Sequence, residues 1–210
     1  REGFQAKEDT PTLADRFMRS RLSRGVEEIT ALYEALDLAQ AAREVYELVW
    51  SEFCDWYLEA AKPALKAGNA HTLRTLEEVL AVLLKLLHPM MPFLTSELYQ
   101  ALTGKEELAL EAWPEPGGRD EEAERAFEAL KQAVTAVRAL KAEAGLPPAQ
   151  EVRVYLEGET APVEENLEVF RFLSRADLLP ERPAKALVKA MPRVTARMPL
   201  EGLLDVEEWR

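Results

Sequence analysis

The sequence predicts a mainly α-helical protein, built as an antiparallel helical bundle that is followed by a small α+β subdomain. Over about the first 145 residues, apolar side chains recur every three or four positions, the spacing of helices that bury one face. At residues 151–158, EVRVYLEG, the pattern changes to alternation with β-branched and aromatic residues, which predicts the first strand. We therefore expect the helical bundle to precede the α+β unit.

The first helix is predicted over residues 11–36, because Thr10 followed by Pro11 is a typical helix start. Its apolar residues step by three and four along one stripe, which consists of Met18, Leu22, Val26, Ile29, Tyr33 and Leu36. Four arginines are expected on the side opposite this stripe, where they face solvent or a partner, namely Arg16, Arg19, Arg21 and Arg24. An ordinary solvated helix face is the alternative interpretation of these arginines.

The second helix is predicted from about residue 38 to residue 67, with an apolar side that includes Phe53 and Trp56. Pro63 is expected to kink this helix, because proline removes a backbone hydrogen bond. The Gly-Asn pair at 68–69 is expected to end it and to cap the next helix.

A third helix, over about 71–87, is rich in Leu and Val around much of its circumference and is expected to be the most buried. It ends at HPMMP, because His88 and Met91 each precede a proline and are pushed out of the α region. The fourth helix is predicted to open at Pro92 and to run to about residue 102.

The remaining elements follow a connector at residues 105–118. A long helix is predicted next, because it has acidic residues in its first turn and Gly145 past its end. The strand at 151–158 is then followed by a short helix over 163–174 and by one or two strands within 185–202. We expect four parts: the bundle at 1–118, a long connecting helix at 119–146, the small α+β subdomain at 147–204, and the start of a truncated C-terminal helix at 205–210.

Composition narrows the class of protein. The chain is 48% hydrophobic and 30% charged, and it has no apolar run of the roughly 20 residues that span a bilayer. A single cysteine forms no internal disulfide and no leader precedes the first helix, so we expect a cytoplasmic protein. The first residue is Arg1 and the last residues read as a helix start, so we expect a piece of a longer protein.

The net charge of −12 argues against nonspecific binding to nucleic acid, but the charge is segregated along the chain. Residues 16–24 carry four arginines and no acidic residue. Residues 182–200 likewise lack acidic residues and carry five basic ones, which are Arg182, Lys185, Lys189, Arg193 and Arg197. These stretches are the candidates for contact with an anionic partner.

Cys54, in FCDWYLEAAKPAL, is the one candidate nucleophile of the thiol class. A thiol enzyme needs a nearby base, and the histidines are His71 and His88. The aromatic neighbours of Cys54 favour a packing role instead. One cysteine and two distant histidines fall short of a zinc site, and the sequence has neither a glycine-rich phosphate loop nor a nucleophile elbow. We expect no catalytic residue, no metal and no cofactor.

Three segments together resemble a known family. FCDWYLEAAKPAL, then LLKLLHPMMPFLTSELYQAL, then Trp-Pro at Trp113 are similar in order and spacing to the anticodon-binding helical domain of the valyl-tRNA synthetases, which are class I aminoacyl-tRNA synthetases. The segment LADRFMRSRL at 13–22 is similar to the D-x-W-hydrophobic motif that starts a helix in this family, with Phe17 where tryptophan is usual. RALKAEAGLPPAQEVRVYL at 138–156 resembles the junction into its small α/β subdomain, and GLLDVEEWR the start of its C-terminal coiled coil.

The resemblance implies a tRNA-binding fragment of a valine-tRNA ligase that reads the anticodon stem-loop. Its partners are then tRNA(Val) and the catalytic and editing domains of the same parent chain, which is expected to be a monomer. The H-x-G-H and K-M-S-K-S motifs of class I synthetases are missing here, so the ATP-dependent attachment of valine is expected of the parent and not of this fragment.

In an up-and-down bundle, the start of the first helix and the join of the second and third helices lie at one end. The resemblance implies that this end faces the anticodon, where aromatic residues stack on loop bases and basic residues contact phosphates. The candidate nucleic-acid-binding residues are Phe4, Arg16, Arg19, Arg21, Arg24, Lys62, Lys66 and Asn69. A helical protein-protein interaction domain without RNA binding, and a thiol hydrolase that uses Cys54, remain the alternatives.

Overall fold

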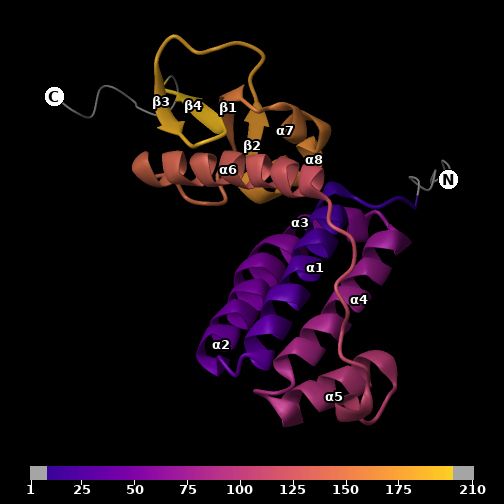
Figure 1. Ribbon diagram of the computed structural model, residues 1–210. Coiled ribbons are helices and arrows are strands. Elements are labelled where there is room, and N and C mark those ends of the chain that lie inside the picture. Colours follow the sequence, from indigo (N-terminus) through magenta and orange to yellow (C-terminus); the bar gives the residue numbers. More distant parts are fainter. Residues whose placement is uncertain (1–8, 201–210) are drawn as a thin grey trace, which may run out of the picture. The chain divides into compact units, whose positions relative to one another are not determined.

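The computed structural model describes residues 9–200 of the chain (Figure 1). The chain divides into two compact units, numbered 1–124 and 125–210. The first unit is helical, and the second combines helices with a four-stranded sheet. The predicted fold class, a mainly α bundle followed by a small α+β subdomain, is confirmed. The helix start expected at residues 205–210 lies outside the described residues.

The first unit contains the predicted helices in the predicted order. Their bounds are α1 Leu13–Glu34, α2 Leu38–Tyr46, the π-helix η1 Glu47–Tyr57, α3 Leu58–Lys66, α4 Ala70–Leu87, α5 Pro92–Thr103 and the short 3-10 helix η2 Leu108–Leu110. The break at HPMMP is confirmed, because α4 ends at Leu87 and Pro92 opens α5. Met91 lies outside the α region as expected, but the same expectation is wrong for His88, which keeps α-helical backbone angles as the C-cap of α4. The helix predicted over 38–67 is continuous, but its middle third is π-helical.

The π-helix changes which aromatic residue is buried. In η1 the buried residues are Leu48, Phe53 and Tyr57, whose spacing of five and four matches the wider turn of a π-helix. The expectation that Trp56 lies on the buried side is therefore wrong: Trp56 is half-buried, whereas Tyr57 is completely buried. Gly25 of α1 lets the two helices approach, since a Cβ there would lie 2.5 Å from a methyl carbon of Leu48.

A buried carboxylate joins three helices of this unit. Asp15, at the start of α1, accepts hydrogen bonds from the Tyr57 hydroxyl at 2.8 Å and from the Thr72 hydroxyl at 2.7 Å. It also accepts from the backbone N–H of Thr12 at 2.9 Å, while the Thr12 hydroxyl accepts from the Asp15 N–H at 3.1 Å, which is a reciprocal capping box. Asp15 thereby fixes the start of α1 against the end of η1 and the first turn of α4.

The second unit is built around α6 (Glu121–Glu143), whose first residues belong to the first unit. The other elements are β1 Val152–Gly158, α7 Ala161–Glu165, α8 Leu167–Ser174, β2 Ala176–Leu178, β3 Ala186–Ala190 and β4 Val194–Pro199. The strand order is β2-β1-β4-β3, with β1 and β2 parallel and the other pairs antiparallel. Strands at 151–158 and within 185–202 are confirmed, whereas the three-residue β2 was not predicted, because so short a segment carries no alternation.

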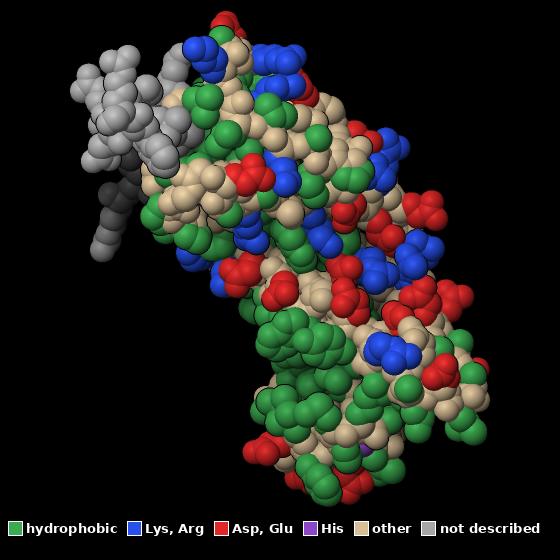
Figure 2. All heavy atoms as spheres, turned by 90° about the vertical axis from the view of Figure 1, so that its left-hand side faces the viewer, with side chains coloured by type: hydrophobic (Ala, Val, Ile, Leu, Met, Phe, Trp, Pro, Cys, Tyr) green, Lys and Arg blue, Asp and Glu red, His purple; other side chains and the backbone are tan. Residues whose placement is uncertain are grey.

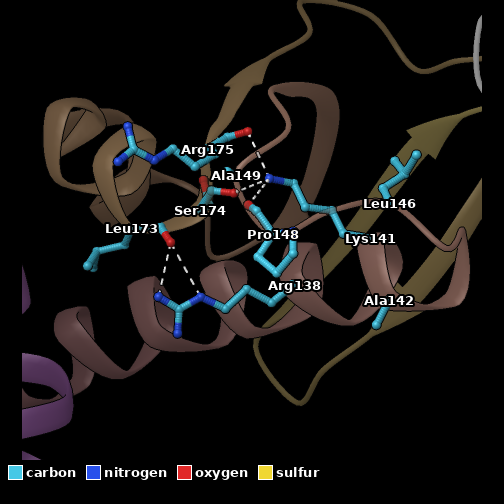
Figure 3. A pocket seen from close by; sticks show the side chains of 9 residues that line it. All are labelled: Arg138, Lys141, Ala142, Leu146, Pro148, Ala149, Leu173, Ser174 and Arg175. Atoms are coloured by element: carbon cyan, nitrogen blue, oxygen red, sulfur yellow. Dashed lines mark hydrogen bonds between the residues drawn. The ribbon is translucent and has the colours of Figure 1, made fainter.

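A buried lysine holds the junction between α6, the following connection and α8. Lys141 is 2% exposed, and its Nζ donates to the carbonyl oxygens of Pro148, Ser174 and Arg175 at 2.8 to 3.2 Å (Figure 3). It also donates to the carbonyl oxygen of Gln150 at 2.6 Å. Burial lowers the pKa of this ammonium, and Arg175 and Arg138 lower it further. The carbonyl oxygens stabilise the buried positive charge of Lys141. The conformation of the surrounding backbone therefore depends on this one side chain.

We expect Tyr57→Phe to lower the free energy of unfolding by roughly 1.5 to 3 kcal/mol at pH 7, because the buried Asp15 carboxylate loses a donor. Burial first, and then the Asp15 charge, raise the pKa of Tyr57 above its ordinary value of 10.0. A raised folded pKa gives stability that is present below pH 10 and is lost as the pH rises above it. The loss of stability above pH 10 should therefore be smaller in Tyr57→Phe, as measured by denaturant melts across pH.

The control for that measurement is Tyr46→Phe, because Tyr46 lies on the surface of the same helical stretch. Its free energy of unfolding should stay within about 0.5 kcal/mol of the parent chain at pH 7. Equal, small effects of the two substitutions would show that the Asp15 contacts do not stabilise the bundle.

Lys141→Met should lower the free energy of unfolding by roughly 1 to 3 kcal/mol, because the carbonyl oxygens around the ammonium lose their donor. The matched substitution is Lys189→Met, which removes a half-exposed lysine that pairs with Glu143 at 3.0 Å. Its effect should stay within about 0.5 kcal/mol, as expected for a surface ion pair. Urea melts that show no difference between the two variants would contradict the role given to Lys141.

Candidate nucleic-acid interface

The start of α1 and the turn between α3 and α4 lie at the same end of the first unit, as predicted (Figure 1). The side-chain amide of Asn69 donates to the Thr10 carbonyl oxygen at 3.1 Å, and the N–H of His71 donates to the Asp9 carboxylate. Arg74 forms an ion pair with Asp9 at 3.0 Å, which lowers the pKa of that carboxyl. The chain that leads into α1 is therefore attached to the first turn of α4.

Three predicted site residues belong to this end. Lys62 and Lys66 lie exposed on the last two turns of α3, and Lys62 pairs with Glu59. Asn69 caps α4, because its Oδ1 accepts from the N–H of Thr72 at 3.0 Å. Asn69 thus shapes the turn, while the two lysines supply positive charge. Phe4, the predicted stacking residue, lies outside the described residues.

Arg16 is held by acidic residues at the start of α6. Its Nε donates to Asp120 Oδ2 at 2.8 Å and its Nη2 to Oδ1 at 3.2 Å, and Glu122 lies 3.5 Å from the same nitrogen. The hydrogen bond from Arg16 is the main reason why the pKa of Asp120 is lowered. The guanidinium remains partly accessible, since the Arg16 side chain is half-exposed.

The expectation that the four arginines share one solvent-facing side is wrong for Arg21. With about 100° between successive residues, Arg19 and Arg21 project roughly 200° apart. Arg19 accordingly donates to Thr75 and Glu78 of α4, whereas Arg21 lies 3.6 Å from Glu52 of η1 with only 18% of its side chain exposed. Arg24 is exposed and pairs with Glu28 one turn further along α1.

In the second basic stretch, at 182–200, four of the five basic residues are paired with acidic residues from elsewhere in the second unit. Arg182 and Arg197 both bind Glu157, and Lys189 binds Glu143. Arg193 binds Glu159 at 3.0 Å, and Arg125 and Arg193 together lower the pKa of that carboxyl, Arg125 most strongly. The segregation of charge along the sequence therefore does not persist in the folded unit.

A pocket of about 440 Å³ in the second unit is lined by Arg138, Lys141 and Arg175 (Figure 3). Lys141 is surrounded by carbonyl oxygens, and Arg138 donates to the Leu173 carbonyl oxygen at 3.0 Å. The Arg175 guanidinium lies over the Phe172 ring, 5.5 Å from its centroid. These cations already bind groups of their own unit, so the pocket is not part of the candidate nucleic-acid interface.

Arg74 is the functional candidate that the sequence analysis missed. It lies in the first turn of α4, beside the turn that holds Asn69, and 58% of its side chain is exposed. Its position in the sequence could have revealed it, because Arg74 follows the Gly-Asn pair at 68–69 by about one helical turn. The start of the helix after that turn lies at the same end of the bundle as the turn itself.

Cys54 lies half-buried in η1. Burial raises the pKa of its thiol, and the neighbouring Asp55 raises it further. A reactive cysteine needs a lowered pKa, so this environment supports the packing interpretation and not the thiol hydrolase. Within residues 9–200 no three His, Cys, Asp or Glu side chains are placed together to hold a metal ion. Over the same range, no helix has the length and apolar character needed to cross a bilayer.

Comparison with known proteins supports the resemblance that the motifs predicted. Residues 15–156 match the family described as "Anticodon-binding domain of tRNA ligase". The chain is 99% identical over its whole length to a valine-tRNA ligase of Thermus thermophilus, of which it covers 24%. It is 45% identical over 98% of its length to the Deinococcus radiodurans valine-tRNA ligase, and 39% identical over 92% to that of Thermotoga maritima, covering 23% of each.

The chain thus spans about a quarter of the length of these relatives. The family match includes the whole described bundle from Asp15 onward, α6 and most of β1. With the bundle, the HPMMP break and the α3–α4 turn as predicted, the chain belongs to the family of anticodon-binding domains of tRNA ligases.

Proposed function

We propose that this chain binds the anticodon stem-loop of tRNA(Val) as part of a longer valine-tRNA ligase. The parent chain attaches valine to tRNA in an ATP-dependent reaction, acts as a monomer in the cytoplasm, and carries its catalytic and editing domains outside these residues. The fragment itself positions RNA and needs no cofactor. The proposal is supported by the family match and by the names of the relatives.

The observation that carries the proposal is the cluster of exposed cations at one end of the bundle. We call this end the α3–α4 end, and its cations are Lys62, Lys66 and Arg74. They flank the Asn69 turn and the chain that leads into α1. A phosphate backbone that crosses this end meets three positive side chains around a rigid turn, which is the arrangement that phosphate contacts require.

The carboxylates that pair with these cations do not prevent RNA binding. Exposed ion pairs such as Arg74 with Asp9, or Lys62 with Glu59, contribute little to stability, because solvent screens them. Phosphate oxygens can replace the carboxylates at little cost, and the planar guanidinium of Arg74 can bind a phosphate through two nitrogens. The acidic partners hold the cations in place before RNA arrives.

Arg16, Arg19 and Arg24 stay in the proposal as peripheral phosphate contacts, because each retains an accessible side chain. Arg21 is not proposed as a phosphate contact, because its side chain is packed beside Glu52. Phe4 is proposed to stack on a loop base, because it precedes Asp9, which binds the start of α4, by five residues in the sequence.

Arg74→Gln should weaken the binding of tRNA(Val) and flatten its salt dependence. Removing one phosphate contact lowers the slope of log affinity against log salt by roughly 0.7 to 0.9. Lys105→Gln is the matched control, because its side chain is also 58% exposed and also pairs with a carboxylate, at Glu111, but lies after α5. The corresponding substitutions are best measured in the full-length Thermus ligase, by titration at several salt concentrations.

Lys105→Gln should leave both affinity and slope unchanged. The same titration on a Lys62→Gln, Lys66→Gln, Arg74→Gln triple variant decides the proposal. An unchanged slope in this variant, with its circular dichroism spectrum intact, would mean that the α3–α4 end is an ordinary solvated surface. The helical protein-interaction alternative would then be favoured.

A further inference from the structure

Helix α5 has apolar side chains that pack against the bundle and others that are exposed. Toward the bundle, Tyr99 packs with Leu84 and Leu108, and Leu102 lies against the same cluster. On the other side, four large apolar side chains lie exposed, and we call them the α5 apolar face: Met91, Phe93, Leu94 and Leu98. Phe93 is 91% exposed. The outer surface of a helix in a finished domain is mostly polar, whereas much of the exposed surface of α5 is apolar.

The spacing of these residues indicates one contact surface. Met91, Leu94 and Leu98 follow one another by three and four positions, so they form a single stripe along α5. Figure 2 shows hydrophobic side chains gathered over the end of the bundle away from the α3–α4 end. Leu36, in the α1–α2 turn, and Leu38, the first residue of α2, are two more exposed apolar residues of the first unit. Exposed apolar surface of this kind marks an interaction site.

The HPMMP break holds α5 in a fixed orientation. Nδ1 of His88 lies 2.8 Å from the Thr95 hydroxyl, and that hydroxyl also donates to the Met91 carbonyl oxygen at 2.8 Å. Thr95 is completely buried, so this network fixes the first turn of α5 against the end of α4. The apolar face is therefore preorganised, which lowers the entropy cost of docking.

The charge of this helix identifies the kind of partner. Residues 91–104 contain no lysine or arginine and one acidic residue, Glu97. A surface without cations does not attract phosphates, so RNA is a poor partner for it. An apolar protein surface is a good one, because burying large apolar side chains stabilises association.

We propose that the α5 apolar face docks onto a domain formed by the part of the parent ligase that lies outside these 210 residues. This proposal rests on the proposed function, in that it takes the chain to be part of such a ligase. The Thermus relative has about three quarters of its length outside the segment that matches. A domain in the same chain is present at a high effective concentration, so it reaches this face before any separate protein does.

The docking is tested by hydroxyl-radical labelling of the 210-residue chain and of the full-length Thermus ligase, both without tRNA. Met and Phe side chains react readily when they are exposed, so Met91 and Phe93 report directly on this face. We expect both to be labelled in the 210-residue chain and to be labelled several-fold more slowly in the full-length ligase. Leu73, an apolar residue of comparable exposure in α4, is the internal control and should be labelled equally in both.

A pair of variants adds an energetic measurement. Leu94→Gln with Leu98→Gln should leave the melting temperature of the 210-residue chain unchanged and should increase the rate at which trypsin releases this domain from the full-length ligase. Leu73→Gln should leave both quantities unchanged, because it replaces an exposed leucine at the other end of the bundle.

Equal labelling of Phe93 in the two proteins would overturn the proposal. If Phe93 were protected only when the labelling is repeated with tRNA(Val) present, the face would be assigned to RNA. Protection of the 210-residue chain at high concentration, with a dimer in sedimentation, would assign it to a second copy. Both results would also overturn the proposal. Protection of Phe93 in a full-length ligase that fails to bind tRNA(Val) would support the docking while contradicting the proposed function.

Discussion

The bundle depends on one buried carboxylate, that of Asp15. Its two oxygens accept hydrogen bonds from the Thr12 backbone, the Tyr57 hydroxyl and the Thr72 hydroxyl, so it connects the starts of α1 and α4 with the end of η1. A buried charge without such donors is strongly unfavourable, which makes the relative position of these helices well defined. The C-D-W-Y sequence at 54–57 owes its importance to this network, through Tyr57 and not through the thiol of Cys54.

The Asp15 network also positions the surface that we propose for RNA. Thr72 lies one turn after Asn69, which caps α4 and binds Thr10, so the same few residues determine the fold and the α3–α4 end. At the other end, the His88 and Thr95 contact sets the direction of α5. The two ends differ in chemistry, since one presents cations and the other presents apolar side chains. This difference is the basis for assigning RNA to one end and a protein domain to the other.

The sequence was sufficient to predict the helices, their order and the breaks, because glycine, proline and capping residues act locally. It placed the start of α1 at Pro11, whereas the helix starts at Leu13, since Thr12 and Asp15 form the capping box. It missed the π-helix because a spacing of five and four at Leu48, Phe53 and Tyr57 resembles an irregular α pattern. The ion pairs of Arg16, Arg21 and the 182–200 stretch could not be predicted, because their acidic partners lie far away in sequence.

The central claim is that this chain contacts the anticodon stem-loop through the α3–α4 end. Phosphate-ethylation interference on tRNA(Val), bound to the full-length Thermus ligase with and without the Arg74→Gln substitution, tests it most directly. The account predicts interference at phosphates of the anticodon stem-loop, and the selective loss of one or two of these positions in the variant. An interference pattern in the stem-loop that is identical in the two proteins, or one confined to the acceptor stem, would contradict it.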